Sequence, residues 1–218
     1  MSYAPTPQTT PTRYRERARY DRDTVHRILD EALICHLGYA RAGHPVVLPT
    51  THARVDETLY LHGSTGSGPV LAAGPTGLPV CVTATLVDGL VLARSALHHS
   101  MAYRSVVVVG AARLVDDEAE KRLALDALLD HVAPGRSADA RPANRRELAA
   151  TAVLALDLIE VSAKVRAGGP ADDAEDMTLP HWAGVVPLSL VAGPPEPAAD
   201  LDPAIALPSY LESYRRSR

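Results

Sequence analysis

The stretch "ICHLGYARAGHPVVLPTTHARVDETLYLHGST", residues 34–65, decides the fold class of this 218-residue chain. It contains three short runs rich in apolar residues, and turn-forming residues separate these runs at 41–45 (RAGHP) and at Asp56-Glu57. Pro49 interrupts the second run, so we expect that strand to lie at a sheet edge or to contain a bulge. Connections this short join antiparallel neighbours, so the stretch predicts a meander of strands and not a βαβ series.

Two helical segments are predicted by apolar residues at helical spacing behind a capping aspartate. The first covers residues 23–33 and begins at Asp23, and the second runs from Asp116 or Asp117 to about residue 132. A short helix is also expected inside the Gly/Ser-rich loop that follows the third strand.

Further strands make the chain predominantly β. Asp88-Gly89 is a strong hairpin signal between two of them, and Gly110 indicates a bulge or a close backbone approach in the next one. The remaining predicted strands cover residues 105–115, 151–168 and 182–193. About eight strands with two or three helices favour a mainly β (α+β) fold, a small antiparallel β-barrel with helices packed outside.

Composition excludes several classes of function. The formal net charge is −4, which leaves no broad basic face for nucleic acid or anionic lipid. No segment approaches 18 uninterrupted apolar residues and the N-terminus has no apolar core of a signal peptide, so we expect no membrane span and a cytoplasmic protein. Cys35 and Cys81 lie in apolar runs without metal-ligand spacing, and we expect both to be buried as small apolar residues.

The two ends of the chain differ from its middle. Residues 1–20 are rich in Pro, Thr and Arg and predict an extended arm that a partner subunit could hold. Residues 193–218 form a Pro-rich tail that we expect on the surface. The region between them, residues 21–192, shows no internal boundary and is predicted to be one domain.

A Gly/Ser-rich loop follows the third strand, at "LHGSTGSG", residues 61–68. Short hydroxyl side chains and free amides near a helix start suit a phosphate, although a flexible connection has the same composition. The loop is neither a Walker A loop nor a dinucleotide fingerprint. His62 shares one strand face with Tyr60 and therefore either lines a cavity or faces solvent.

A second polar group, "HHSMAYRS" at residues 98–105, precedes four valines. Arg104 lies so close to buried structure that its charge needs a partner, either a phosphate or a carboxylate in an ion pair. His98 and His99 are adjacent, so on a strand they would point in opposite directions. Lys164 and Arg166 form another cationic group at a strand end, which either binds a ligand or is simply solvated.

No catalytic machinery of the protein's own is visible. The sequence has no nucleophile elbow and no HExxH motif, and the acidic run at 172–176 is interpreted as a solvated loop, so we predict no metal site. Cationic and hydroxyl groups at strand ends instead indicate an anionic cofactor that supplies the chemistry.

Four segments in order resemble one family, the pyridoxamine 5'-phosphate oxidase-like FMN-binding split-barrel proteins. They are residues 19–65, residues 79–115, "SAKVRAGGP" at 162–170 and "PHWAGVVPL" at 180–188. The most similar branch is the flavin-nucleotide-binding group that includes the nitroimidazole-resistance reductases. The resemblance implies an antiparallel split β-barrel with flanking helices over residues 21–192, and a homodimer that binds two FMN molecules at its interface.

The resemblance also implies roles for particular residues. His62 occupies the position of the active-site histidine and is the expected catalytic residue. The expected FMN-binding residues are Pro49, Thr50, Thr51, His62, Gly63, Ser64, Ser67, Val82, Thr83, Tyr103, Arg104 and Ser105. The expected substrate pocket contains His99, Met101, Lys164, Arg166 and Trp182.

The chain departs from the family pattern at the phosphate loop. Relatives carry an Arg or Lys near the end of this loop, whereas this chain has Gly68-Pro69, which removes a cation expected to hold the phosphate. Ala102 replaces a second polar residue. Other split-barrel proteins bind haem or the deazaflavin F420, so both cofactors remain alternatives, with His62, His98 or His99 as the axial ligand of a haem.

These features predict an FMN-dependent oxidoreductase that reduces or oxidises a small planar organic substrate, with NAD(P)H as a possible electron donor. A haem-binding protein on the same scaffold, used for haem handling or haem-dependent chemistry, is the alternative. A barrel that has lost its cofactor and serves as a binding module is the third possibility.

Overall fold

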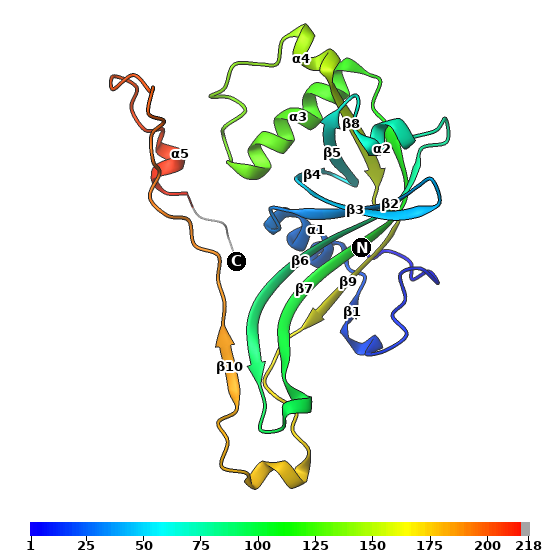
Figure 1. Cartoon of the computed structure of the whole chain (residues 1–218), viewed down its shortest axis with the longest axis vertical. Helices are drawn as coiled ribbons and strands as arrows, with labels where there is room; N and C mark the ends of the chain where they lie inside the picture. Colours follow the sequence, from blue (N-terminus) through cyan, green and yellow to red (C-terminus); the bar gives the residue numbers. More distant parts are fainter. Residues whose placement is uncertain (215–218) are drawn as a thin grey trace.

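The computed structural model describes residues 1–214 and shows a mainly antiparallel sheet with helices around it (Figure 1). The strands are β1 (Ala18–Arg19), β2 (Cys35–Arg41), β3 (His44–Thr50), β4 (His52–Val55), β5 (Thr58–Ser64), β6 (Leu78–Leu92), β7 (Ser100–Leu114), β8 (Thr151–Asp157), β9 (Glu160–Arg166) and β10 (Gly184–Pro187). The helices are α1 (Arg22–Glu31), α2 (Gly68–Ala72), α3 (Glu118–Val132), α4 (Arg145–Ala150) and α5 (Ser209–Glu212), with 3-10 turns η1 (Arg15–Arg17), η2 (Ala96–His98) and η3 (Ala174–Thr178).

The strand order is β3-β2-β6-β7-β8-β5-β4, and β9 and β10 pair with β7 and β6 outside this path. Because β3 and β4 end the path and do not pair, the sheet stays open, which confirms the predicted antiparallel split β-barrel. The β2–β3 hairpin turns at Ala42 and Gly43, whose φ angles of 49° and 80° are those of a tight hairpin turn. Pro49 lies in β3, at an edge of the sheet, as expected.

The longest strands differ from the sequence prediction. Asp88-Gly89 does not form a turn, because β6 continues past it to Leu92 with a register shift between Val87 and Gly89. A Cβ on Gly89 would lie 2.9 Å from the carbonyl oxygen of Val186, so this glycine admits the backbone of β10. The polar residues 100–105 were predicted to precede a strand, but they lie within β7.

Close approach also explains Gly110. This residue stays in register with Val80, so it forms no bulge, but a Cβ there would lie 2.8 Å from Cδ1 of Leu156. The predicted strand at 151–168 is two strands, β8 and β9, and the predicted strand at 182–193 is the four-residue β10.

The core lies between the inner face of the sheet and α1. Leu59, Val82 and Val106 are fully buried there, together with Leu29 of α1. Helix α1 is capped by Asp21, whose carboxylate accepts a hydrogen bond from the Thr24 amide, and not by Asp23. Helix α3 begins behind Asp117, as predicted.

The N-terminal segment packs on its own chain. Tyr3 is 6% exposed and its hydroxyl donates to Glu57 at 2.8 Å, and Thr9 is also buried. Tyr3 and Thr9 therefore attach this segment to its own chain. Cys35 is buried as expected, whereas Cys81 is exposed and both thiols are free.

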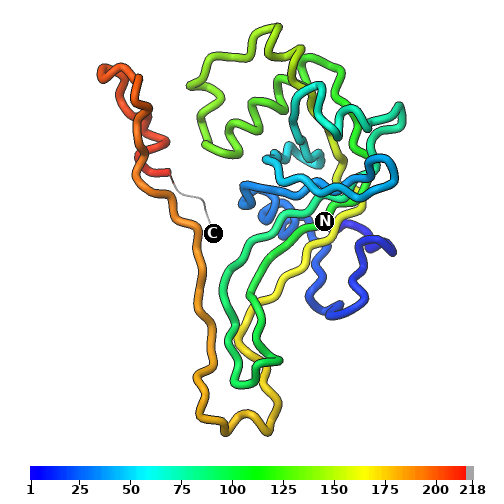
Figure 2. Tube along the Cα trace, in the orientation of Figure 1, coloured from blue at the N-terminus to red at the C-terminus, as the bar shows by residue number. Residues whose placement is uncertain are grey.

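The C-terminal segment leaves the barrel at β10 and returns to it near the end of α3 (Figures 1 and 2). The hydroxyl of Tyr210 donates to Asp139 at 2.8 Å, and that of Tyr214 donates to the carbonyl of Val132 at 2.7 Å. Of the predicted tail at 193–218, residues 215–218 lie outside the described part. Within residues 1–214, no helix is long and apolar enough to cross a membrane.

Candidate functional site: two pockets that share one histidine

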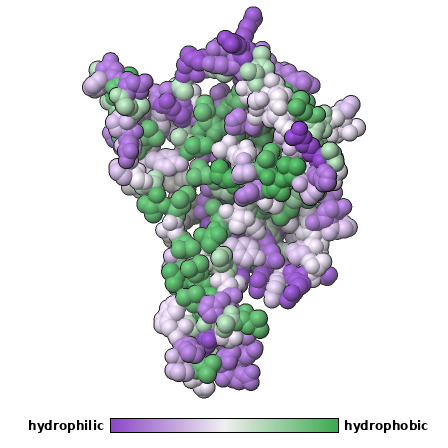
Figure 3. Space-filling model, in the orientation of Figure 1, coloured by the Kyte–Doolittle hydropathy of each residue, from purple (hydrophilic) through white to green (hydrophobic). Residues whose placement is uncertain are grey.

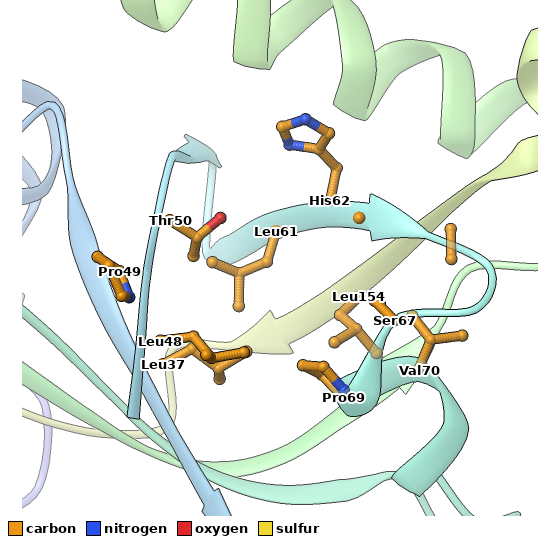
Figure 4. A pocket seen from close by; sticks show the side chains of 12 residues that line it. Leu37, Leu48, Pro49, Thr50, Leu61, His62, Ser67, Pro69, Val70 and Leu154 are labelled. Carbon is orange, nitrogen blue, oxygen red and sulfur yellow. The ribbon is translucent and has the colours of Figure 1, made fainter. Parts of the chain in front are cut away.

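The first pocket lies between β2, β3, β5 and α2, and has a volume of about 200 Å³ (Figure 4). Its lining is mostly apolar, with the hydroxyls of Thr50 and Ser67 as polar groups, and His62 lies at its edge with the imidazole turned away from the other lining side chains. The lining residues are Leu37, Leu48, Pro49, Thr50, Leu61, His62, Gly63, Ser67, Pro69, Val70, Ala152 and Leu154. Ligand pockets usually measure roughly 300–1,000 Å³, so this space covers part of a flavin-sized molecule.

The second pocket lies between β5, α3, α4 and the loop that joins the two helices, and has a volume of about 450 Å³. Helix α3 supplies an apolar wall, and charged groups lie on the α4 side. The lining residues are Thr51, His62, Leu125, Asp126, Leu128, Leu129, Val132, Ser137, Ala140, Arg141, Pro142, Ala143, Glu147 and Thr151.

His62 lines both pockets. It belongs to β5 and pairs with Val153 of β8, so strand alternation turns its side chain away from the buried Leu61 and toward α3 (Figure 4). Tyr60 shares this face, as predicted, but it is buried and its hydroxyl donates to Glu120 at 2.9 Å. The imidazole of His62 is exposed and points toward α3, on the side of the second pocket, so it can act there as an iron ligand or as a proton donor.

Most backbone amides of the Gly/Ser-rich loop donate hydrogen bonds to acceptors within the protein. The amide of Thr65 donates to the carbonyl of Ala150, that of Gly66 to Oγ of Ser64 at 3.1 Å, and that of Ser67 to the carbonyl of Ser64 at 2.9 Å. The free amides that we expected for a phosphate are therefore engaged within the protein. What the loop offers to the first pocket is the side chain of Ser67.

The predicted cofactor residues fall into two groups. The first group lies at the two pockets and contains Pro49, Thr50, Thr51, His62, Gly63 and Ser67, with Ser64 next to them. Val82 is fully buried in the core and Thr83 pairs with His36 of β2, and neither lines the first or the second pocket. The second group, Tyr103 to Ser105, lies on β7 opposite β9.

Arg104 is held by two carboxylates. Its guanidinium donates to both oxygens of Asp88, at 2.9 and 2.7 Å, and to both oxygens of Glu31. These hydrogen bonds, to Glu31 first and then to Asp88, raise the pKa of Arg104 above its ordinary value. Of the two alternatives, the ion pair is the one that this chain shows, and the guanidinium is not free to hold a phosphate.

The predicted substrate residues lie around the extended ends of β6, β7, β9 and β10. Arg166 donates to the carbonyl of Met101 at 3.0 Å, and Lys164 lies opposite Ser105 in the ladder. A Cβ on Gly184 would meet the Trp182 ring at 2.8 Å, so that ring lies against β10, and it is 66% exposed. His99 follows η2, and its Nδ1 lies 3.0 Å from the carbonyl oxygen of Ser95.

The acidic run beyond β9 is more ordered than a solvated loop. Asp172 accepts hydrogen bonds from the amides of Arg94 and Ser95 and an ion pair from the Arg94 guanidinium, and these bonds lower its pKa against the effect of burial. Ligand atoms of His98, Asp172 and Asp176 lie within 4.8 Å of one another. Asp172 already pairs with Arg94, and its hydrogen bonds hold the loop after β9 against the segment that follows β6.

The second pocket was missed by the sequence analysis. Apolar residues at helical spacing predicted α3, and of its stripe of Leu125, Leu128, Leu129 and Val132 the last two are 43% and 42% exposed. A stripe of this kind does not distinguish a core face from a pocket wall. No signal in the sequence identified Arg141.

An open antiparallel barrel is the architecture of split β-barrel proteins, so this protein belongs to that class. Residues 21–165 match the family model described as pyridoxamine 5'-phosphate oxidase, so the chain belongs to that family, as predicted from the resemblance. No curated protein matches the chain.

Three solved structures are similar to this chain. The flavocytochrome Anf3 from Azotobacter vinelandii is 39% identical, with a TM-score of 0.91 and coverage of 99% of this chain and 100% of that one. The FAD and heme binding protein from Mycobacterium smegmatis is 38% identical, with a TM-score of 0.84 and coverage of 90% and 96%. A putative 5-nitroimidazole antibiotic resistance protein from Bacteroides thetaiotaomicron is 25% identical, with a TM-score of 0.58 and coverage of 68% and 86%.

Proposed function

We propose that this protein is an oxidoreductase that binds a flavin nucleotide in the first pocket and a haem in the second. The observation that carries the proposal is that one exposed histidine, His62, lines both pockets. Two relatives that match nearly the whole chain support it, because one is a flavocytochrome and the other is described as binding FAD and heme. The flavin-only and haem-only alternatives thus merge into one protein with two cofactors.

The first pocket suits the flat ring of a flavin. Leu37 and Leu61 provide an apolar floor, and Thr50 and Ser67 provide hydroxyls that hydrogen-bond to a polar ring edge. A bound flavin would supply hydride or single-electron transfer, while the protein orients the ring and excludes water. FMN remains our prediction for the nucleotide, FAD is the form named in one relative, and F420 is an alternative.

The second pocket suits a haem. Leu125, Leu128 and Leu129 form an apolar wall along α3 that suits the flat apolar face of a porphyrin. Neutral imidazole is a common axial ligand of haem iron, so we assign this role to His62. His98 and His99 lie at η2 and line neither pocket, which makes them weaker candidates.

We also propose a homodimer, because an exposed apolar band runs along β10 beside the barrel. Figure 3 shows apolar side chains gathered along β10, and the exposed ones there and just beyond it are Val185, Val186, Leu188, Leu190 and Val191. A second copy packed on this band would cover these apolar side chains. In this arrangement each site, with its small planar substrate and an NAD(P)H donor, is shared by two chains.

The test is the cofactor content of the purified protein and of His62→Ala. The flavin is identified by chromatography after acid release, and the haem by its pyridine haemochrome spectrum. We expect both cofactors in the wild type, and in His62→Ala a loss of haem with flavin retained. His36→Ala, an exposed histidine of β2, is the matched control and should retain both. A wild type that takes up neither cofactor, or a His62→Ala variant with a full haem complement and an unchanged spectrum, overturns the proposal.

A further inference from the structure

The departure at Gly68-Pro69 raises the question of which cation holds a phosphate at the first pocket. The loop position that carries Arg or Lys in relatives has no charge in this chain, and the amides of Thr65, Gly66 and Ser67 are engaged within the protein. Arg104 is held by two carboxylates. A phosphate here needs positive charge from another element.

Arg41 lies at this position. It ends β2, on the same strand face as Leu37, which lines the first pocket, and as the buried Tyr39. A Cβ on Gly68 would lie 3.5 Å from Nη1 of Arg41 and 2.7 Å from the hydroxyl oxygen of Tyr39. The guanidinium therefore lies against the backbone that joins Ser67 to Pro69, the segment that forms the pocket rim.

The guanidinium of Arg41 is also free to bind a ligand. Among residues 1–214 its guanidinium makes no hydrogen bond and no ion pair, and its side chain is exposed at the end of the hairpin. Most other arginines near the barrel have a carboxylate, as Arg104 has Asp88 and Arg54 has Asp30. An unpaired guanidinium beside a pocket rim is suited to bind an oxyanion from the solvent, because its planar fork matches two phosphate oxygens.

Gly68, which stands where relatives carry a cation, allows Arg41 and Tyr39 to approach the loop backbone. A side chain at position 68 would displace the Tyr39 hydroxyl and crowd Arg41, whereas Gly68 lets both approach the backbone. Along β2, Arg41 lies four residues from Leu37, or roughly 13 Å at the usual rise of a strand. That separation allows the ring of a nucleotide to lie over the pocket floor while its phosphate reaches the strand end.

We infer that Arg41, with the hydroxyl of Tyr39 beside it, is the phosphate-binding group of the first pocket and replaces the missing loop cation. The ligand class is the phosphate monoester or diphosphate of a flavin nucleotide, so the inference rests on the proposed function. Affinity gained through this group depends on the phosphate and not on the ring.

The experiment compares FMN, FAD and riboflavin, which lacks the phosphate, by quenching of flavin fluorescence on titration with the apoprotein. The variants are Arg41→Gln, Arg41→Lys and Gly68→Ala, and Arg146→Gln serves as a control because Arg146 is exposed on α4 and lines neither pocket. For the wild type we expect tighter binding of FMN than of riboflavin. In Arg41→Gln the dissociation constant for FMN and FAD should rise roughly tenfold or more, with that for riboflavin unchanged.

Arg41→Lys should retain part of the preference for FMN, and Gly68→Ala should lose part of it. Equal affinities of the wild type for FMN and riboflavin, or an Arg41→Gln variant that keeps the wild-type preference, overturn the inference while leaving the proposed flavin site intact. A wild type that binds none of the three flavins refutes the proposed flavin site and the inference together. Thermal unfolding of each variant shows whether a lower affinity reflects a folding defect.

Discussion

His52 and His131 are in contact, with their ring centroids 4.8 Å apart and their planes tilted by 46°, and Nε2 of each donates to a carbonyl at the C-terminal end of α1. His52 donates to Leu29 at 2.9 Å and His131 to Ala32 at 2.8 Å, so two imidazoles satisfy acceptors that a helix end leaves without intrahelical partners. His52 is completely buried, and His131 belongs to α3. The pair therefore ties α3 and β4 to α1.

His52→Phe keeps a ring but removes the donor. We expect it to lower the free energy of unfolding by about 2 kcal/mol, because the Leu29 carbonyl is left buried without this partner. Urea denaturation at neutral pH measures the loss. His44→Gln, at an exposed position of β3, should unfold like the wild type. A His52→Phe variant as stable as the wild type would show that the hydrogen bond contributes little.

Arg104 lies where a charge without a partner is costly, because its side chain is 22% exposed and that of Glu31 is 13% exposed. Arg104→Gln leaves Glu31 and Asp88 facing each other, so we expect a loss of about 2 kcal/mol in unfolding free energy. Adding Glu31→Gln should restore part of it, because one of the opposed charges is removed. Urea denaturation of the apoprotein measures both. If Arg104→Gln keeps wild-type stability and instead weakens FMN binding, Arg104 is a phosphate ligand after all.

Local signals account for the parts of the fold that the sequence predicted. The β2–β3 hairpin depends on Ala42-Gly43, the start of α3 on Asp117, and the edge position of β3 on Pro49. Each of these features is decided by residues within a few positions along the chain, through turn geometry, capping or the missing amide of proline.

Contacts between residues far apart in the sequence account for the features that the sequence analysis predicted wrongly or left open. The glycine at position 89 was predicted to make a turn, but the backbone at Val186, almost a hundred residues away, requires it. The partner of Arg104 was left open because Glu31 is 73 residues distant. The first pocket followed from the family resemblance, whereas the second depends on how α3 packs beside β5, which no local pattern records.

Gly89→Ala tests the docking of β10. The added Cβ would lie 2.9 Å from the Val186 carbonyl oxygen, so β10 must shift or detach, and we expect a loss of about 1–3 kcal/mol in unfolding free energy. Limited proteolysis should cut the segment after η3 faster than in the wild type. Gly169→Ala is the control, since a Cβ there meets nothing within 4 Å. Equal proteolysis of Gly89→Ala and the wild type would refute the close approach.

Glu120 makes part of the free energy of unfolding depend on pH. The hydrogen bonds from Arg113, together with the one from the Tyr60 hydroxyl, hold the pKa of Glu120 below its ordinary 4.5 despite partial burial. A carboxyl whose pKa is lower in the folded protein stabilises the fold above its unfolded pKa, and this contribution disappears as the pH falls through the folded pKa. The contribution is therefore complete at neutral pH and absent in strong acid.

Glu120→Gln should accordingly lower the unfolding free energy by about 1 kcal/mol at pH 7, since Arg113 is half exposed, and the difference from the wild type should shrink below pH 4.5. Urea denaturation over a pH series measures this convergence. Glu118→Gln, whose exposed carboxylate pairs with Arg122, should cost less at pH 7. A wild-type advantage over Glu120→Gln that stays constant into acid would contradict the assignment.

The two pockets can be separated by a matched pair of charge substitutions. Leu129→Glu places a carboxylate in the apolar wall of the second pocket, and Val70→Glu places one in the lining of the first. Both side chains are partly exposed, so neither change should prevent folding. Because burying a charge against an apolar ligand is costly, we expect Leu129→Glu to lose roughly tenfold in haem affinity and Val70→Glu to lose as much in flavin affinity.

Each variant should retain the other cofactor, which haem titration and flavin fluorescence measure on the same preparations. This result is expected only if His62 lies at the boundary between two separate sites and not in the wall of a single site. If both variants lose the same cofactor to the same extent, the two pockets are parts of a single site and a one-cofactor protein replaces the flavin-and-haem arrangement.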